Sequence, residues 1–232
     1  MPFKKDKQMS ETFLIGALLA VTGGFLDAYS YLLRGYVFAN AQTGNIVLLG
    51  VNLAGGKFTQ VLYYFIPIVA FAAGILVSEL IRRAFREHTN IHWRQITVAA
   101  EFIILLIVAF IPRGTFDVIA NVAISFICSL QVQSFRKVNG NAYATTMCTG
   151  NLRSATEKLF QYHITKDKQE RNKSLQYYGI ILFFILGAGI GAWCSHFFAE
   201  KSVLICCALL LAAFLVMFIQ PLSPENPENS SI

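Results

Sequence analysis

The chain has 232 residues, of which 55% are hydrophobic and only 14% are charged. Soluble domains carry about 25% charged residues, so this composition excludes an ordinary soluble globular domain. The formal net charge of +6 does not indicate a nucleic-acid partner, because the basic residues lie in short segments between apolar runs, where they set membrane orientation. The composition therefore predicts an integral membrane protein whose main partner is the lipid bilayer.

The apolar runs predict an all-α, polytopic membrane helix bundle, since a spanning helix needs about 20 apolar residues. The first run follows a polar N-terminus and lacks a small-residue cleavage site, so we interpret it as a retained span and not as a signal peptide. The last run is followed by 221–232, rich in Pro, Glu, Asn and Ser, which we expect to be disordered. Six runs meet the length requirement: 13–33, 61–81, 95–111, 116–135, 175–197 and 202–219.

Two further segments have helix length but are interrupted by polar residues around a glycine. They are Tyr36–Gly55 and Asn141–Phe160, and each contains the tripeptide Thr-Gly-Asn, at 43–45 and at 149–151. Glycine breaks or tightly turns a helix, and the second segment is too polar for a simple span. We expect both to be broken, re-entrant or interfacial segments.

The order of features around the two tripeptides repeats. Each tripeptide is followed by a polar linker, then by a Tyr-Tyr pair that opens an apolar run with small residues in its middle, and then by a further apolar run. The pairs are Tyr63-Tyr64 and Tyr177-Tyr178. This order predicts that a single membrane domain, 1–232, contains two structural repeats, at 12–112 and 115–220.

The placement of the basic residues predicts the orientation of the chain. If neither Thr-Gly-Asn segment crosses the membrane, six spans put both termini on one side, together with fifteen of the nineteen Lys and Arg residues. The positive-inside rule assigns that side to the cytoplasm. Each half then has three spans, and an odd number inverts the second half relative to the first. If both segments crossed, the basic segment 82–94 would move outside, which the rule disfavours.

Inverted repeats with interrupted helices are a recurring plan of secondary transporters, whose sites lie near the bilayer midplane. Freed backbone groups and polar side chains beside such breaks can line a cavity. The alternative is that these small and polar residues only pack helices together. We expect one polar half-site from Asn40, Gln42, Thr43, Gly44 and Asn45, and a second from Thr145, Thr146, Thr149, Gly150 and Asn151.

Acidic residues within the apolar runs are the strongest functional candidates. Asp27 lies well inside the first run, where a charge costs roughly 2.5–3.5 kcal/mol and therefore faces a partner or a wet cavity. It is a candidate proton carrier, or else it pairs with Arg34, two helical turns on. Glu101 is a second candidate for proton coupling, or a partner of Arg94 at the same spacing. Aligning the halves on the tripeptides places Gln133 opposite Asp27, as a candidate for the same cavity.

Other polar residues have simpler interpretations. Glu79 precedes Arg82 and Arg83 at i+3 and i+4, which is typical of an ion pair on a helix surface. Asp117 closely follows Arg113, and we expect it at the membrane interface. The Tyr-Tyr pairs lie near span ends, where interfacial anchoring accounts for them.

Enzymatic interpretations find little support in the sequence. It contains no G-x-S-x-G, H-E-x-x-H or Walker motif. Its four His are scattered, and its five Cys have neither a C-x-x-C pair nor a metal-ligand spacing with His. We expect the Cys to be buried small hydrophobes. The sequence therefore predicts neither an enzyme nor a bound metal or cofactor.

The stretch 22–50, TGGFLDAYSYLLRGYVFANAQTGNIVLLG, resembles the signature of the YoaK-like family of uncharacterised bacterial integral membrane proteins, a domain-of-unknown-function family. The G-G-x-x-D-A-x-S/T-Y core and the downstream T-G-N carry the resemblance, which extends over nearly the whole chain. It implies a bacterial membrane protein of about six spans and implies no substrate. The matching positions add Tyr31 to the candidate site, and they are Gly23, Gly24, Asp27, Tyr31, Asn40, Thr43, Gly44 and Asn45.

The most concrete hypothesis is a secondary transporter or permease for a small polar solute, in which two inverted halves alternate around the Thr-Gly-Asn breaks. The alternative is a non-transporting membrane scaffold or regulator. The predicted location is the bacterial inner membrane, with both termini cytoplasmic. A homo-oligomer is compatible with the sequence, although no feature demands one.

Overall fold

The computed structural model describes residues 12–85, 93–143 and 147–218, and it confirms the predicted all-α architecture. A two-residue antiparallel hairpin, β1 (Lys137–Val138) and β2 (Asn141–Ala142), separates α5 from α6. The N-terminal lysines and the tail 221–232 lie outside the described residues. The helices are α1 (Phe13–Leu33), α2 (Gln42–Ala54), α3 (Phe58–Phe85), α4 (Trp93–Val108), α5 (Asp117–Ser134), α6 (Cys148–Thr165), α7 (Lys168–Phe198), the 3-10 helix η2 (Ala199–Val203) and α8 (Leu204–Phe218).

Four helical stretches within the described ranges are long and apolar enough to cross a bilayer. They are Phe13–Leu33, Phe58–Phe85, Asp117–Ser134 and Lys168–Met217. The last stretch joins α7, η2 and α8, so it contains two of the predicted runs. By contrast, α4 has 16 residues and is about 24 Å long, shorter than the hydrocarbon core of about 30 Å. The count of six spans therefore stays a prediction.

The two Thr-Gly-Asn segments both form the start of a helix that follows a chain reversal. Each tripeptide lies in the first turn of its helix, α2 or α6. Before α2 the chain reverses through Gly35 and Tyr36, which both have positive φ, and before α6 it reverses through Asn139 and Gly140, which also do. Glycine adopts this left-handed conformation without a steric penalty. The predicted interruptions are therefore loops that precede each tripeptide.

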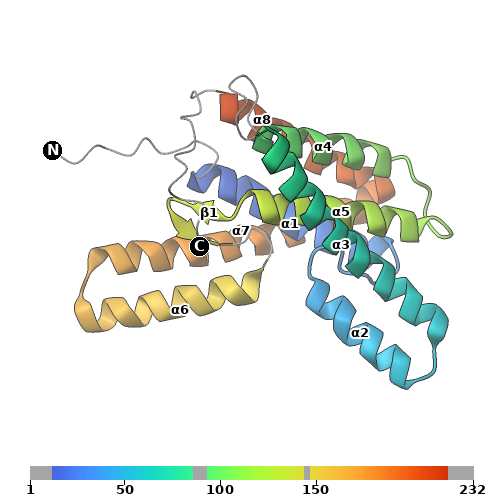
Figure 1. The fold of residues 1–232 in the computed structure, drawn as a ribbon, viewed down its shortest axis with the longest axis horizontal. Helices are drawn as coiled ribbons and strands as arrows, with labels where there is room; N and C mark the ends of the chain where they lie inside the picture. The colour runs from blue at the N-terminus through green and yellow to red at the C-terminus, as the bar shows by residue number, and fades with distance from the viewer. Residues whose placement is uncertain (1–11, 86–92, 144–146, 219–232) are drawn as a thin grey trace.

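The long helices pack in two close pairs, α1 with α7 and α3 with α5. In Figure 1, α2 lies alongside α3 and α6 lies alongside α7, at opposite ends of the molecule. Glycine makes the close approach in both pairs possible. A Cβ on Gly24 or Gly187 would collide with backbone atoms across the α1–α7 contact, and a Cβ on Gly74 would collide with Phe126 across the α3–α5 contact. Close packing through small residues is typical of membrane helices.

The surface is strongly apolar, as a lipid-facing surface must be. Large side chains such as Leu76, Phe110 and Trp193 are more than half exposed. Contiguous apolar surface of this kind is rare on water-soluble monomers. The buried core in turn contains polar side chains from several helices, and these define the candidate site. Further exposed members of the apolar surface are Ile46, Val51, Leu62, Leu80, Ile107, Leu182 and Phe197.

Candidate functional site

The carboxyl group of Asp27 accepts hydrogen bonds from the non-helical segment that precedes α2. Asp27 lies in α1 and is buried, and its Oδ1 accepts hydrogen bonds from the backbone N–H groups of Asn40 (2.9 Å) and Ala41 (3.3 Å). One turn later, Ser30 Oγ accepts the N–H of Ala39 at 3.1 Å. Backbone groups away from water must find partners within the protein. Side chains of α1 therefore supply the acceptors that the non-helical segment needs.

The side chains of Asn45 and Gln42, at the start of α2, form hydrogen bonds with the same loop. The wholly buried Asn45 donates from Nδ2 to the Phe38 carbonyl oxygen at 2.6 Å and to Gln42 Oε1 at 3.0 Å, and its Oδ1 accepts the Phe38 N–H at 3.2 Å. Gln42 Nε2 donates to the Ala39 carbonyl oxygen at 2.9 Å and lies 3.4 Å from Ser125 Oγ on α5. The hydrogen bonds of these two predicted site residues stabilise the loop before α2. This agrees with the alternative in which the polar residues only pack the helices together.

The remaining first-half candidates divide between the surface and the interior. Thr43 is exposed, and Gly44 packs so closely on the Phe38 ring that a Cβ would lie 2.9 Å from it. Tyr31 is 37% exposed and stacks on Phe38, with ring centroids 4.8 Å apart. Tyr31 therefore belongs to an aromatic group on the surface.

Asn40 and Glu101 are buried and carry polar atoms that no described residue satisfies. Asn40 is 4% exposed, and both its Nδ2 and its Oδ1 lack a hydrogen-bond partner. Glu101 on α4 is 2% exposed, and its Oε1 likewise lacks one. Asp27 and Asn40 are in direct contact through the Asn40 backbone N–H, and we term these two residues the central cluster.

The first turn of α6 holds the residues of the predicted second half-site that the structure describes. Cys148, the first residue of α6, is half-buried. Asn151 is buried, whereas Thr149 and Gly150 are exposed. Thr145 and Thr146 of the predicted second half-site lie outside the described residues. The second tripeptide thus places Asn151 in the interior while its neighbours face outward.

Gln133 lies apart from the central cluster. Its Nε2 contacts Oε1 of Glu79 on α3, and Glu79 also pairs with Arg82 at 3.4 Å, as predicted from their i,i+3 spacing. The predicted partner of Glu101 also lies elsewhere, because Arg94 Nε donates to the Ser134 carbonyl oxygen at 3.0 Å. The Arg94–Glu101 alternative is therefore wrong.

The predicted Asp27–Arg34 pair is likewise wrong. Arg34 is wholly buried and pairs with Asp117 at 3.0 Å. Its guanidinium also donates to the Tyr29 hydroxyl, at 2.7 Å and 3.1 Å, and to backbone carbonyl oxygens of Val108, Ile111 and Pro112. The expectation failed because α1 ends at Leu33. Helical spacing therefore no longer determines where the Arg34 side chain points.

Two tyrosines that the sequence indicated only as interfacial anchors have matching structural partners. Tyr63 on α3 donates its hydroxyl to the Arg34 carbonyl oxygen at 2.7 Å, and Tyr177 on α7 donates to the Ala142 carbonyl oxygen at 2.6 Å. Each acceptor lies in the segment that connects the preceding long helix to a Thr-Gly-Asn helix, Arg34 just after α1 and Ala142 in β2. The recurring Tyr-Tyr pair was the signal that could have revealed this role.

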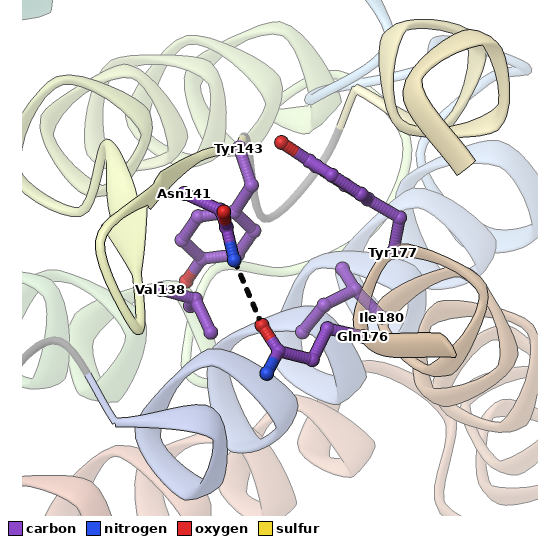
Figure 2. A pocket seen from close by; sticks show the side chains of 6 residues that line it. All are labelled: Val138, Asn141, Tyr143, Gln176, Tyr177 and Ile180. Atoms are coloured by element: carbon purple, nitrogen blue, oxygen red, sulfur yellow. Dashed lines mark hydrogen bonds between the residues drawn. The ribbon is translucent and has the colours of Figure 1, made fainter. Parts of the chain in front are cut away.

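A small hollow lies beside the β1–β2 hairpin, away from the predicted site residues. Figure 2 shows its lining, in which Asn141 Nδ2 donates to Gln176 Oε1 at 3.0 Å. The hollow is mostly apolar and open on one side. Within the described ranges, no group of three or more His, Cys, Asp or Glu side chains is placed to hold a metal ion. The other lining residues are Val138, Tyr143, Tyr177 and Ile180.

Comparison with known proteins gives two matches. The sequence model of a family described as "Protein of unknown function (DUF1275)" matches residues 15–216. The chain is also 27% identical over 218 residues to the UPF0700 transmembrane protein YoaK of Bacillus subtilis (strain 168), a match that covers 86% of this chain and 92% of the relative. No solved structure matches the chain.

Proposed function

The chain belongs to the DUF1275 family, as the segment from Gly23 to Asn45 predicted, and on that premise we propose that this integral membrane protein is a permease for a small polar solute. Its proposed location is a bacterial inner membrane, with both termini in the cytoplasm. It is proposed to move a solute and to catalyse no reaction. The central cluster of Asp27 and Asn40 is its proposed site, and Glu101 is a second buried carboxyl group proposed for proton coupling.

The observation that carries this proposal is the role of Asp27. Its carboxyl group, deep in an apolar helix, accepts the backbone N–H groups of the non-helical segment before α2. Beside it, the Asn40 carboxamide has no hydrogen-bond partner among the described residues. Acidic residues within membrane helices normally mark ion or solute pathways. Breaks in helices at such depth are tolerated where they are buried in protein or line a cavity. A break, a carboxyl group and unsatisfied polar atoms at one place are the expected parts of a transport site.

An inverted repeat of three and three spans is the second part of the proposal. Exchanging the halves maps α1 onto α5 and α3 onto α7, and under this exchange the α1–α7 contact becomes the α5–α3 contact. The contacts of α2 with α3 and of α6 with α7 also correspond, as do the hydrogen bonds of Tyr63 and Tyr177. These correspondences support two equivalent halves that rock against each other around the central cluster.

Flux measurements in vesicles test the function. The purified protein would be reconstituted with a pH-sensitive dye inside, and a panel of amino acids, sugars, alkali salts and methylammonium would be added outside. We expect at least one solute to produce a pH-linked signal that Asp27→Asn abolishes. Glu79→Gln is the matched control, because it neutralises a carboxyl outside the cluster. An unchanged signal in Asp27→Asn would remove the proton-coupling role from that residue.

A scaffold or regulator without transport is the second candidate, and the hydrogen bonds of Asn45 favour it. Its side chain is fully used within the loop, as a packing residue would be. The double variant Asn45→Ala with Asn151→Ala discriminates between the two functions. A scaffold predicts reduced thermal stability and no solute in the panel that stabilises the wild type, whereas a permease predicts solute-dependent stabilisation that the variant weakens.

A further inference from the structure

The hairpin formed by α6 and the start of α7 is longer than its counterpart, which is formed by α2 and the start of α3. The chain advances 27 residues from Gly150 to Tyr177, the first residue of the Tyr-Tyr pair, but only 19 from Gly44 to Tyr63. Helix α7 begins seven residues before the apolar run 175–197, whereas α3 begins three residues before the run 61–81. The α6–α7 hairpin therefore extends further beyond its membrane-spanning run.

The two hairpins also differ in charge. Between 40 and 64 the one charged residue is Lys57, whereas 148–178 contains six Lys and Arg residues and three acidic residues. The acidic residues are Glu157, Asp167 and Glu170, and the basic residues are Arg153, Lys158, Lys166, Lys168, Arg171 and Lys173.

Half of these basic side chains are not used within the hairpin. Lys158 and Lys173 both pair with Glu170, and Arg171 lies over the Tyr162 ring. The remaining three are exposed and have no side-chain partner among the described residues. They are Arg153, Lys166 and Lys168. The hairpin thus offers free positive charge to a partner outside it.

Contacts between α6 and α7 place this charge at the surface of the bilayer. Ser174 Oγ donates to the Ala155 carbonyl oxygen at 2.8 Å, just before the apolar run of α7 begins. Ala155 is therefore level with the edge of the hydrocarbon core. The seven residues of α7 outside this run, 168–174, rise about 10 Å. The headgroup layer on each side is roughly 5–8 Å thick, and long basic side chains bend toward it.

The outer side of α6 carries apolar side chains beside this charge. Leu152 and Leu159 are seven residues apart, as are Arg153 and Phe160, so all four lie on one side of the helix. All four are exposed. The opposite side, which includes Ala155, is buried against α7, and α6 lies beside α7 at one end of the molecule (Figure 1). Apolar and basic side chains together on an exposed helix face are typical of contact with a lipid surface.

We infer that the outer face of the α6–α7 hairpin binds anionic phospholipids of the bilayer that holds the protein. Arg153, Lys166 and Lys168 would pair with phosphate oxygens through charge-assisted hydrogen bonds. Leu152, Leu159 and Phe160 would contact the apolar part of the lipids. Clusters of basic residues next to a membrane span are a recognised feature of anionic-lipid binding. The inference concerns an anchoring surface and does not depend on transport.

Native mass spectrometry of the purified full chain tests the inference. The protein would be released from detergent micelles that contain equal amounts of phosphatidylglycerol, which is anionic, and phosphatidylcholine, which is zwitterionic. One basic residue near an anionic surface gives roughly a fivefold preference. We therefore expect phosphatidylglycerol adducts to exceed phosphatidylcholine adducts by at least about fivefold.

Three variants locate the binding surface. The triple variant Arg153→Gln, Lys166→Gln and Lys168→Gln should lower the preference for phosphatidylglycerol at least about fivefold. Arg153→Lys with Lys166→Arg and Lys168→Arg preserves the charge and should retain the preference. Lys57→Gln, which removes the exposed charge of the other hairpin, should also retain it.

The substituted side chains are exposed, so the variants should unfold at the wild-type temperature in micelles that contain phosphatidylcholine alone. The inference is overturned if the wild type retains both lipids equally, a result that would leave an acidic protein as the partner of this surface. It is also overturned if the triple glutamine variant keeps the wild-type preference, or if Lys57→Gln lowers the preference as much.

Discussion

Arg34 and Asp117, 83 residues apart in the chain, form an ion pair of 3.0 Å in which the arginine side chain is wholly buried. The pair joins the end of α1 to the start of α5. Arg34 reinforces this junction through its own carbonyl oxygen, which accepts from Tyr63 on α3 and Asn121 on α5, both at 2.7 Å. One residue therefore ties three helices together at one end of the bundle.

Replacement of Arg34 by Ala should strongly destabilise the protein. Removing one member of a buried ion pair costs about 3–5 kcal/mol, because the partner is left uncompensated. Arg34→Lys should recover only part of this loss, since an ammonium cannot reproduce the planar fork of a guanidinium. Unfolding of the purified variants in detergent measures both effects.

The Glu79–Arg82 pair provides the control for this prediction. Both side chains are about one-third exposed, so Arg82→Ala should change stability by about 1 kcal/mol or less. Equal losses in Arg34→Ala and Arg82→Ala would show that burial of the Arg34 pair has no special importance.

Two glycines on one helix give a matched test of the α1–α7 contact. A Cβ on Gly187 would collide with the Val21 backbone, whereas a Cβ on Gly189 meets nothing within 4 Å. Overpacking typically costs about 1–3 kcal/mol, and a rigid backbone neighbour favours the upper end. Gly187→Ala should therefore lower the unfolding midpoint, while Gly189→Ala should keep or raise it because Ala is the better helix former.

Two-sided thiol labelling tests the inverted arrangement. Lys57, between α2 and α3, and Lys166, between α6 and α7, are both exposed. In a background without the five native Cys, Lys57→Cys should react with a membrane-impermeant maleimide in intact cells, and Lys166→Cys only after the cells are opened. Reaction of both from the same side would contradict the inverted repeat and, with it, the shared central site.

The tip of the α6–α7 hairpin should loosen at acidic pH. Hydrogen bonds from Lys173 and Lys158 hold the pKa of Glu170 below its ordinary value of 4.5. A lowered carboxyl pKa contributes stability that is present above the ordinary pKa and is lost as pH falls through the folded-state pKa. Hydrogen exchange of the amides around 158–173, corrected for intrinsic rates, should therefore accelerate as the pH falls below the ordinary glutamate pKa of 4.5. Glu170→Gln should remove most of this pH dependence.

Much of the helical fold could be predicted from the sequence, because apolar runs of helix length indicate membrane helices and the positive charges mark the segments between them. The two Thr-Gly-Asn segments were also identified as irregular. The sequence could not reveal that Asp27 accepts loop amides from Asn40 and Ala41, since hydrophobic periodicity carries no information on loops that fold back on a helix. The Arg34 prediction failed for a related reason: it assumed helical geometry one residue beyond the end of α1.

The two tyrosine pairs illustrate a different limit. Their recurrence supported a repeat, but interfacial tyrosines are common enough that the sequence alone favoured simple anchoring. Only the positions of the Arg34 and Ala142 carbonyl groups distinguish the two roles. Gln133 was placed by counting from the tripeptides, and this count ignored the β1–β2 hairpin, which lengthens the second loop.

The pairing of α1 with α7 also sets the order in which the bundle can assemble during synthesis. The partners α3 and α5 lie close in the chain and can pack once Ser134 has been made. The glycine-bearing face of α1 can pack only after Gly187 and Gly191 of α7 have been made, because those residues complete the α1–α7 contact. Nascent chains that stop between these points therefore present an open α1 to the membrane, as partly folded targets for chaperones and quality-control proteases.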